Sequence, residues 1–228
     1  MARQLTFDLS SEPALGRDDF LVAPANALAM AVLEAPASWP RGRMLLLGPE
    51  GSGKTHLAAI WAAAAGAALL PAHALRSDAA DALAVEGGAV AVEDADRAGG
   101  PDGGVERALF HLWNLCEARG CRLLLTARLP PRRWRLTLPD LRSRMEAMPV
   151  TRIEPPDEAL LAAVLVKLLA DRQLTAPPGL IDWLVPRMDR DLGLARRLVA
   201  ALDGETLAGH RALTRGLAGD LLAKLAGD

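Results

Sequence analysis

The run from residue 48 to residue 55, GPEGSGKT, constrains this chain more than any other stretch. It matches the phosphate-binding pattern G-x-x-x-x-G-K-[ST], follows the apolar run 44–47 and opens an alanine-rich helical segment, which is the strand–turn–helix context that such a match requires. The glycines let backbone N–H groups turn inward around an anion, and the helix adds its positive N-terminal end. The sequence therefore predicts a mononucleotide site, for which ATP and ADP are equal candidates. The residues expected to hold the nucleotide are Gly48, Gly51, Ser52, Gly53, Lys54 and Thr55, with Lys54 on the β- and γ-phosphates.

Two acidic residues mark the expected metal end of this site. Glu93 and Asp94 follow the apolar run 89–92 at the tip of a strand, where an open α/β sheet places its ligand crevice. Thr55 and one of these carboxylates would ligate Mg²⁺, and the other would orient an attacking water. A solvated strand end is the alternative, but it does not explain two adjacent acids behind an apolar run in a P-loop chain. Thr126, at the end of the next strand, is a weaker candidate for contact with the γ-phosphate or the water, because threonine is common in strands.

Apolar runs alternate with helical segments from residue 13 to residue 154. Strands are expected at 44–47, 67–70, 89–93, 122–126 and 149–153, with helices between them that include a weak one over 75–83. Continuous apolar runs of this kind are typical of parallel strands buried on both faces. The sequence therefore predicts an α/β protein with a five-stranded parallel sheet.

The character of the chain changes at Pro155-Pro156. Apolar residues recur at helical spacing from there on, and several helices are expected between residue 157 and Leu225. We expect a P-loop α/β nucleotide-binding domain over 13–154, a small all-α domain over 155–228 and an N-terminal tail over 1–12.

Composition adds limits on partners and compartment. Hydrophobic residues are 51% of 228 and the net charge is −2, so the chain can bury a core and is not drawn by charge to nucleic acid or to an anionic membrane. Neither a signal peptide nor a membrane-spanning run is visible. Cys116 and Cys121 are too few for a disulfide framework, which favours the reducing cytoplasm. His111 lies near them, but four zinc ligands are not met there, so we expect buried free thiols.

Two further stretches leave alternatives open. In the tail, Leu5, Phe7 and Leu9 alternate as in a strand docked on the domain, or as in an extended peptide inserted into a partner's groove. Around Trp134, basic residues and an aromatic ring are the features with which a nucleic-acid surface holds phosphates and stacks a base, although a solvated loop fits the overall charge better. The basic residues are Arg128, Arg132, Arg133 and Arg135.

Several blocks, taken in order, resemble the DnaA family of AAA+ ATPases. They are FLVAPAN at 20–26, GPEGSGKTHL at 48–57, LFHLWN at 109–114, the Leu-Thr and Pro-Pro pairs within 125–131, LRSR at 141–144 and EPP at 154–156. The blocks span most of the chain. The resemblance implies an AAA+ P-loop NTPase fold followed by a helical lid, and it adds His56 to the nucleotide site.

Within that family the chain is most similar to the Hda group, the regulatory inactivators of DnaA. The sequence ends after the lid segment, without the helix-turn-helix duplex reader of DnaA-type initiators, and it begins with a Gln-Leu peptide. The resemblance implies that this N-terminal motif binds the sliding clamp of DNA polymerase III and that the chain meets DNA indirectly, through the clamp. The motif falls on Gln4, Leu5, Phe7 and Leu9, and Phe7 departs from the residue usual in that group.

The same resemblance implies roles for two arginines. Arg144 would be an arginine finger that points at ATP held by a DnaA subunit and stabilises charge on the transferring phosphoryl group. Arg196 would be the lid's sensor 2 arginine, in contact with this chain's own nucleotide. Two departures from the family affect hydrolysis more than binding: Glu93 stands where Asp is usual, and Ala127-Arg128 where a polar or acidic sensor residue is usual. We therefore expect slow intrinsic ATP turnover.

The function implied is negative regulation of replication initiation, through stimulated hydrolysis of DnaA-bound ATP. A helicase loader or remodeller with its own ATP cycle is the alternative, and the altered Glu93/Ala127 pair weighs against it. A small-molecule kinase would need an acceptor site, whereas the segment after residue 155 resembles a lid. An arginine finger needs a neighbouring molecule, so DnaA is the expected partner and a homo-oligomer remains open.

Overall fold

The fold is built around a parallel sheet whose strands end beside one another. The computed structural model describes residues 15–100, 103–209 and 212–226, so the expected tail over 1–12 lies outside the described residues. The sheet has five strands in the order β2-β3-β4-β1-β5, and every pairing is parallel, which confirms the predicted sheet. The strands are β1 Arg43–Leu47, β2 Ala68–Pro71, β3 Ala89–Glu93, β4 Arg122–Ala127 and β5 Val150–Arg152.

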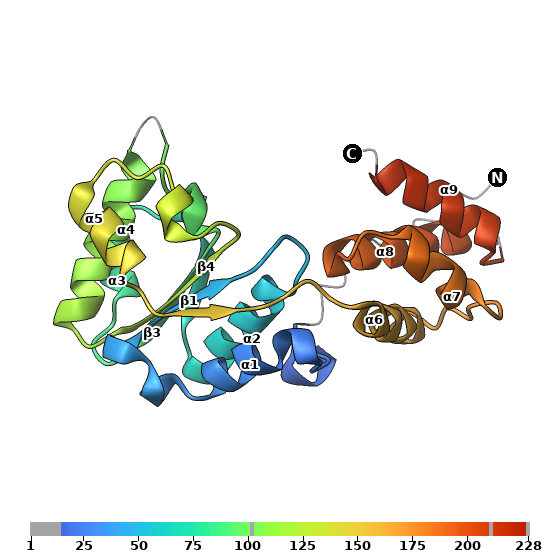
Figure 1. Ribbon diagram of the computed structural model, residues 1–228, viewed down its shortest axis with the longest axis horizontal. Helices are drawn as coiled ribbons and strands as arrows, with labels where there is room; N and C mark the ends of the chain where they lie inside the picture. Colours follow the sequence, from blue (N-terminus) through green and yellow to red (C-terminus); the bar gives the residue numbers. More distant parts are fainter. Residues whose placement is uncertain (1–14, 101–102, 210–211, 227–228) are drawn as a thin grey trace, which may run out of the picture.

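Helices cover both faces of the sheet, as its apolar strands require (Figure 1). Successive residues of a strand point to opposite faces, so Leu45 and Leu47 pack in one core with α3, α4 and α5. Met44 and Leu46 pack in a second core with α1 and α2. The helices are α1 Pro24–Glu34, α2 Lys54–Ala65, α3 Ala80–Leu83, α4 Gly104–Ala118 and α5 Pro139–Glu146.

The weak helix expected over 75–83 is mostly wrong. Only α3, a single turn, is α-helical, and a short 3-10 segment over Ala72–Ala74 precedes it. Between the two, Arg76 is hydrogen-bonded to Asp78 at 3.1 Å across a turn. Serine and aspartate compete with helix formation through such local hydrogen bonds, and here they sit where the helix was expected to continue.

The residues after β5 form a helical lid with a hydrophobic core of its own. Asp157 caps the first helix by accepting a 2.7 Å hydrogen bond from the Leu160 N–H. Leu161, Leu184 and Leu198 are fully buried in this core. Figure 1 shows the lid beyond the P-loop side of the sheet, with α5 at the opposite end of the molecule. The lid helices are α6 Glu158–Asp171, α7 Leu180–Leu184, α8 Leu192–Gly209 and α9 Arg215–Ala226.

No described helix combines the length and the apolar character needed to span a bilayer. Both cysteines are free and buried, as expected. Burial raises the pKa of the Cys116 and Cys121 thiols, so neither is a reactive thiolate near neutral pH.

A buried carboxylate on α4 fixes the segment that leads into α5. Glu106 is fully buried, and its two carboxylate oxygens accept hydrogen bonds from the Thr137 N–H, the Thr137 hydroxyl and the Leu138 N–H at 2.6–2.7 Å. Leu138 is the residue before α5 begins. The position of α5 therefore depends on one acidic side chain of another helix.

Replacement of this carboxylate should destabilise the protein. Glu106→Ala leaves two partly buried N–H donors without their acceptor, which costs about 2 kcal/mol of unfolding free energy. Urea denaturation followed by circular dichroism measures the change. Glu86→Ala, at an exposed position, is the matched control and should stay within about 0.5 kcal/mol of the wild type. Equal effects from the two substitutions would contradict this role for Glu106.

Candidate functional site

The phosphate-binding loop runs from β1 into α2 with no room for side chains at two of its glycines. A Cβ on Gly48 would lie 2.4 Å from Ile153 Cγ2, and one on Gly51 would lie 1.8 Å from Asp191 Oδ1. Gly51 also has a φ of +67°, which side-chain-bearing residues rarely adopt. The loop thus passes directly beneath β5 and the lid, and its amides are held where a phosphate group can meet them.

Lys54 and Ser52 are turned into the loop. The Lys54 Nζ donates a 2.6 Å hydrogen bond to the Pro49 carbonyl, and the Ser52 hydroxyl donates to the same oxygen at 2.9 Å. Burial lowers the pKa of Lys54, and the charge of nearby Arg128 lowers it further. A buried ammonium that donates to a carbonyl would be stabilised strongly by an anionic partner. That is the chemistry expected of a P-loop lysine.

The strand-end acids are placed by the end of β3, and Thr126, near the end of β4, contacts the backbone of one of them. Asp94 adopts a left-handed conformation, with a φ of +52°, directly after Glu93 closes the strand. The Thr126 hydroxyl accepts a 3.1 Å hydrogen bond from the Asp94 N–H, and Thr126 is buried outside the pocket that the P-loop lines. Thr126 therefore supports the turn at Asp94, and its predicted contact with phosphate or water stays a prediction.

The surroundings of Asp94 suit phosphate better than they suit Mg²⁺. Thr55 lines the P-loop pocket and is exposed, as a metal ligand would need to be. The Asp94 carboxylate, however, is flanked by two guanidinium groups: Arg128 Nε lies 3.8 Å from Oδ1 and Arg97 Nη1 lies 3.9 Å from Oδ2. Two neighbouring cations weaken the attraction of that carboxylate for a dication. The predicted metal site therefore lacks an uncompensated acidic ligand at Asp94.

A larger cavity adjoins the P-loop pocket. The P-loop pocket has a volume of about 200 Å³, and the adjoining cavity, of about 700 Å³, lies between the α/β domain and the lid. The two share Gly53, Arg196 and Arg197 in their walls. The larger one has a mainly apolar lining, within the size range of small-ligand sites. An apolar cavity joined to a cationic one is the arrangement that a nucleoside and its phosphates require. The larger apolar side chains of this cavity are Phe20, Leu21, Leu160, Val164, Leu168 and Leu192.

His56 and Arg196 meet at the junction of these two cavities. An Arg196 Nη2 donor lies 3.0 Å from His56 Nδ1, and His56 Nε2 lies 2.9 Å from the Gly16 carbonyl. Since arginine only donates and a carbonyl only accepts, the ring must be neutral with its proton on Nε2. Burial and the charge of Arg196 lower the pKa of His56, in agreement with a neutral ring. The Phe20 ring packs edge-on against His56 with centroids 5.1 Å apart.

The lid touches the P-loop through residues that the sequence reading missed. The Leu192 N–H donates a 2.9 Å hydrogen bond to the Gly51 carbonyl, and Asp191 caps α8 by accepting from the Gly193 and Leu194 N–H groups at 2.6 and 3.0 Å. The Asp-Leu-Gly-Leu sequence is a helix-start signal that would have found Asp191. Arg197 beside the predicted Arg196 carried no separate signal.

A second link joins the lid to the segment before α1. The Lys167 Nζ on α6 donates to Asp19 Oδ1 at 2.8 Å and to Asp171 Oδ2 at 2.8 Å. The hydrogen bond from Lys167 lowers the pKa of Asp19. Asp19 and Lys167 stand far apart in sequence, and no local pattern pairs them.

Arg144 lies on α5, away from the P-loop, and packs on α4. Its Nη1 donates a short hydrogen bond to Asn114 Oδ1 and lies 3.7 Å from Glu117 Oε2, and its guanidinium lies 5.1 Å from the centre of the Phe110 ring. The side chain is 35% exposed. Glu117 also lies 3.4 Å from Arg43 Nη1, so one carboxylate links β1, α4 and α5.

The arginine-rich loop after β4 does not form a stacking surface. Trp134 is buried, and its Nε1 donates a 2.7 Å hydrogen bond to the Leu129 carbonyl, so the ring cannot stack on a base. Arg128 turns toward the P-loop pocket instead. The exposed basic residues of the loop are Arg132, Arg133 and Arg135.

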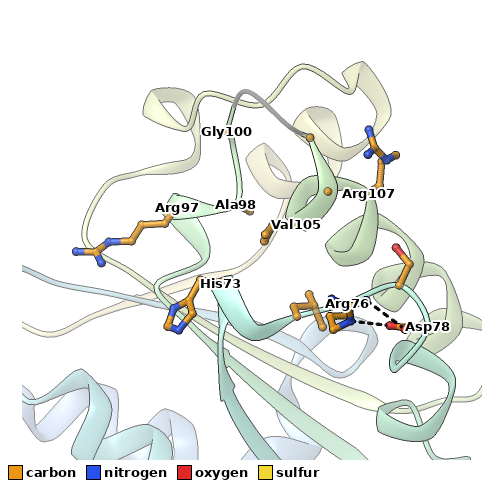
Figure 2. Close-up of a pocket in the computed structure, with 12 residues that line it drawn as sticks. His73, Arg76, Asp78, Arg97, Ala98, Gly100, Val105 and Arg107 are labelled. Carbon is orange, nitrogen blue, oxygen red and sulfur yellow. Dashed lines mark hydrogen bonds and ion pairs between the residues drawn. The ribbon is translucent and has the colours of Figure 1, made fainter.

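Another pocket, of about 580 Å³, lies between the segments that follow β2 and β3. Figure 2 shows that its basic side chains do not converge: Arg97 and Arg107 point in opposite directions, and Arg76 is hydrogen-bonded to Asp78. Charges that diverge do not define an anion site. The P-loop pocket and its neighbour therefore remain the candidate site.

Comparison with solved structures identifies the fold. Domain III of the replication initiation protein DnaA from Thermotoga maritima superposes with a TM-score of 0.77 at 20% identity, covering 94% of this chain and 98% of that one. DnaA from Aquifex aeolicus bound to AMPPCP superposes with a TM-score of 0.66 at 18% identity, covering 87% of this chain and 68% of that one. The FIGL-1 AAA domain in complex with ADP superposes with a TM-score of 0.63 at 14% identity, covering 88% of this chain and 79% of that one.

The chain has the AAA+ fold. Its strand order and its C-terminal helices match those of these structures, which confirms the predicted fold class. No protein-family model matches the chain. Identities of this size show a shared fold, and activity has to be argued from the site itself.

The neutral His56 makes the stability of this AAA+ fold depend on pH. Its pKa lies below the ordinary 6.5 in the folded protein, so the unfolded chain takes up the proton first as the pH falls. Stability is therefore complete above about pH 6.5 and falls as the pH drops toward the folded-state pKa, by at most about 1.4 kcal/mol per pH unit. Asp19, with a pKa below 3.8, does not titrate in this window.

Chemical denaturation at pH 7.5 and 5.5 tests this dependence. We expect the wild type to lose more unfolding free energy than His56→Gln, which has a donor and an acceptor but does not titrate. His73→Gln, at an exposed position, is the control and should retain the wild-type slope. A His56→Gln slope equal to that of the wild type would assign the pH dependence to other groups.

Proposed function

We propose that this chain binds an adenine nucleotide and regulates replication initiation by stimulating hydrolysis of ATP bound to DnaA. The P-loop pocket, with Lys54 and Thr55 in its wall, and the apolar cavity beside it support nucleotide binding. Two of the similar structures are described as bound to AMPPCP or ADP, which supports an adenine nucleotide. The DnaA structures among them support replication initiation as the process.

The observation that carries the regulatory role is the position of Arg144. It does not line the pocket of its own chain, and α5 lies at the end of the molecule opposite the lid (Figure 1). Phe110, Asn114 and Glu117 hold the side chain partly exposed on the surface of α4. A guanidinium held in this way cannot serve its own nucleotide, but it can complete the site of a neighbouring molecule, as arginine fingers do.

Hydrolysis in this chain itself is proposed to be slow. Arg128 stands where the resemblance expects a polar or acidic sensor residue, and Thr126 supports the backbone of Asp94. Arginine has no acceptor atom with which to take a proton from an attacking water. The nucleotide of this chain would then set the position of the lid through Arg196 and the contact between Leu192 and Gly51.

Substitution of Arg144 tests the central claim. In a mixture of DnaA-ATP, sliding clamp, DNA and this protein, the wild type should produce DnaA-ADP. Arg144→Ala should lower the stimulated rate by about 10³-fold or more, the range measured for arginine fingers in trans. Arg144→Lys should also fail, because lysine lacks the bidentate fork. Arg142→Ala, at an exposed position on the same helix, is the control and should remain active.

Two outcomes would reject this function. One is a wild type that gives no DnaA-ADP in the complete mixture. The other is ATP turnover by the chain alone that single-stranded DNA or a helicase stimulates and Lys54→Ala abolishes, which would favour the loader or remodeller.

The proposed contact with the clamp has a separate test. The motif at Gln4, Leu5, Phe7 and Leu9 should bind the sliding clamp of DNA polymerase III, so the double variant Gln4→Ala/Leu5→Ala should be lost from a clamp pull-down. It should equally lose the stimulation of DnaA when the clamp is loaded on DNA. Ser10→Ala/Ser11→Ala, just beyond the motif, is the control. Retention of the Gln4→Ala/Leu5→Ala variant on the clamp would exclude the tail as the binding element.

A further inference from the structure

Arg128 places a permanent positive charge at the P-loop pocket. It follows β4 directly and lines the pocket of about 200 Å³ together with Lys54, Thr55 and Asp94. Because parallel strands end at one edge of the sheet, the residue after β4 faces the turn after β1. The Arg128 side chain is 30% exposed, open enough to meet a ligand and buried enough for its charge to act strongly.

The main chain at this position is fixed. Asp96 Oδ2 accepts hydrogen bonds from the N–H groups of Arg128 and Leu129 at 3.3 and 3.2 Å. The arginine therefore reaches the pocket from an anchored Cα, and only its side chain has to adjust when a ligand enters.

The side chain lies between two acidic groups of the site. Its Nη1 makes a short contact with Glu50 Oε2, on the P-loop, and its Nε lies 3.8 Å from Asp94 Oδ1, on the turn after β3. Glu50 is 66% exposed, so water solvates it readily once its partner turns away. A phosphate group offers the same guanidinium a bidentate acceptor with more charge.

We propose that Arg128 neutralises the terminal phosphate of a bound nucleoside di- or triphosphate from within the chain, so that nucleotide binding does not require Mg²⁺. Arg97 and Arg128 already compensate the carboxylate of Asp94, which is one of the two acids expected to hold the metal or the attacking water. Lys54 and Arg128 then approach the phosphates from two sides, where the metal would otherwise supply charge. This inference rests on the proposed nucleotide binding, and it concerns affinity for the nucleotide, not the action on DnaA.

Calorimetric titration with ADP and with ATP, in MgCl₂ or in EDTA, tests the proposal. The wild-type Kd should change by less than about threefold between the two buffers. Arg128→Ala should weaken binding in EDTA by about tenfold or more, the loss of one charge-assisted contact, and binding should then depend on Mg²⁺. Arg128→Gln keeps most of the side chain without its charge and should behave in the same way, which guards against a folding defect in the alanine variant.

Arg132→Ala is the matched control, because it removes one positive charge from the same loop at an exposed position. Its affinity for both nucleotides should equal that of the wild type. A wild type that needs Mg²⁺ for tight binding, or an Arg132→Ala variant as impaired as Arg128→Ala, would overturn the role of Arg128 and leave the proposed function standing. Absence of binding of both nucleotides in both buffers would overturn the proposed function as well.

Discussion

The site depends on how closely the P-loop can pass under its neighbours. At Gly48 and Gly51 the backbone runs where any Cβ would collide with Ile153 or with Asp191. This close approach lets the Gly51 carbonyl accept a hydrogen bond from the lid at Leu192. The sheet, the phosphate loop and the lid are therefore tied together at a point where only glycine fits, and the two pockets of the candidate site open beside it.

Electrostatics around that point favour anions. Lys54, Arg128, Arg196 and Arg197 line one small pocket, and its acids, Asp94 among them, have basic neighbours. Burial lowers the pKa of Lys54 and of Arg196, which shows that their charges are poorly solvated. In a site of this kind the poorly solvated cations raise the free energy of the empty pocket, and a bound phosphate group would lower it by pairing with them.

Patterns within short segments were enough to predict the sheet, the P-loop and the approximate place of the lid. Apolar runs fixed the strands because both faces of a parallel sheet are buried. Local patterns failed where an interaction spans the fold. The Thr126 hydroxyl accepts a hydrogen bond from the turn after another strand, a contact that its own segment does not reveal. The Lys167–Asp19 contact and the turning of Arg128 toward Glu50 likewise depend on strands and helices brought together from distant parts of the chain.

The hydrogen bonds Gly16–His56 and His56–Arg196 connect the segment before α1 to the lid. The Gly16 carbonyl accepts a hydrogen bond from His56 Nε2, and His56 Nδ1 accepts one from the Arg196 guanidinium of the lid. Because one rigid ring makes both contacts, a rotation of the imidazole that breaks the hydrogen bond to Gly16 also disturbs the hydrogen bond to Arg196, so the segment before α1 and the lid are coupled through a single side chain of α2.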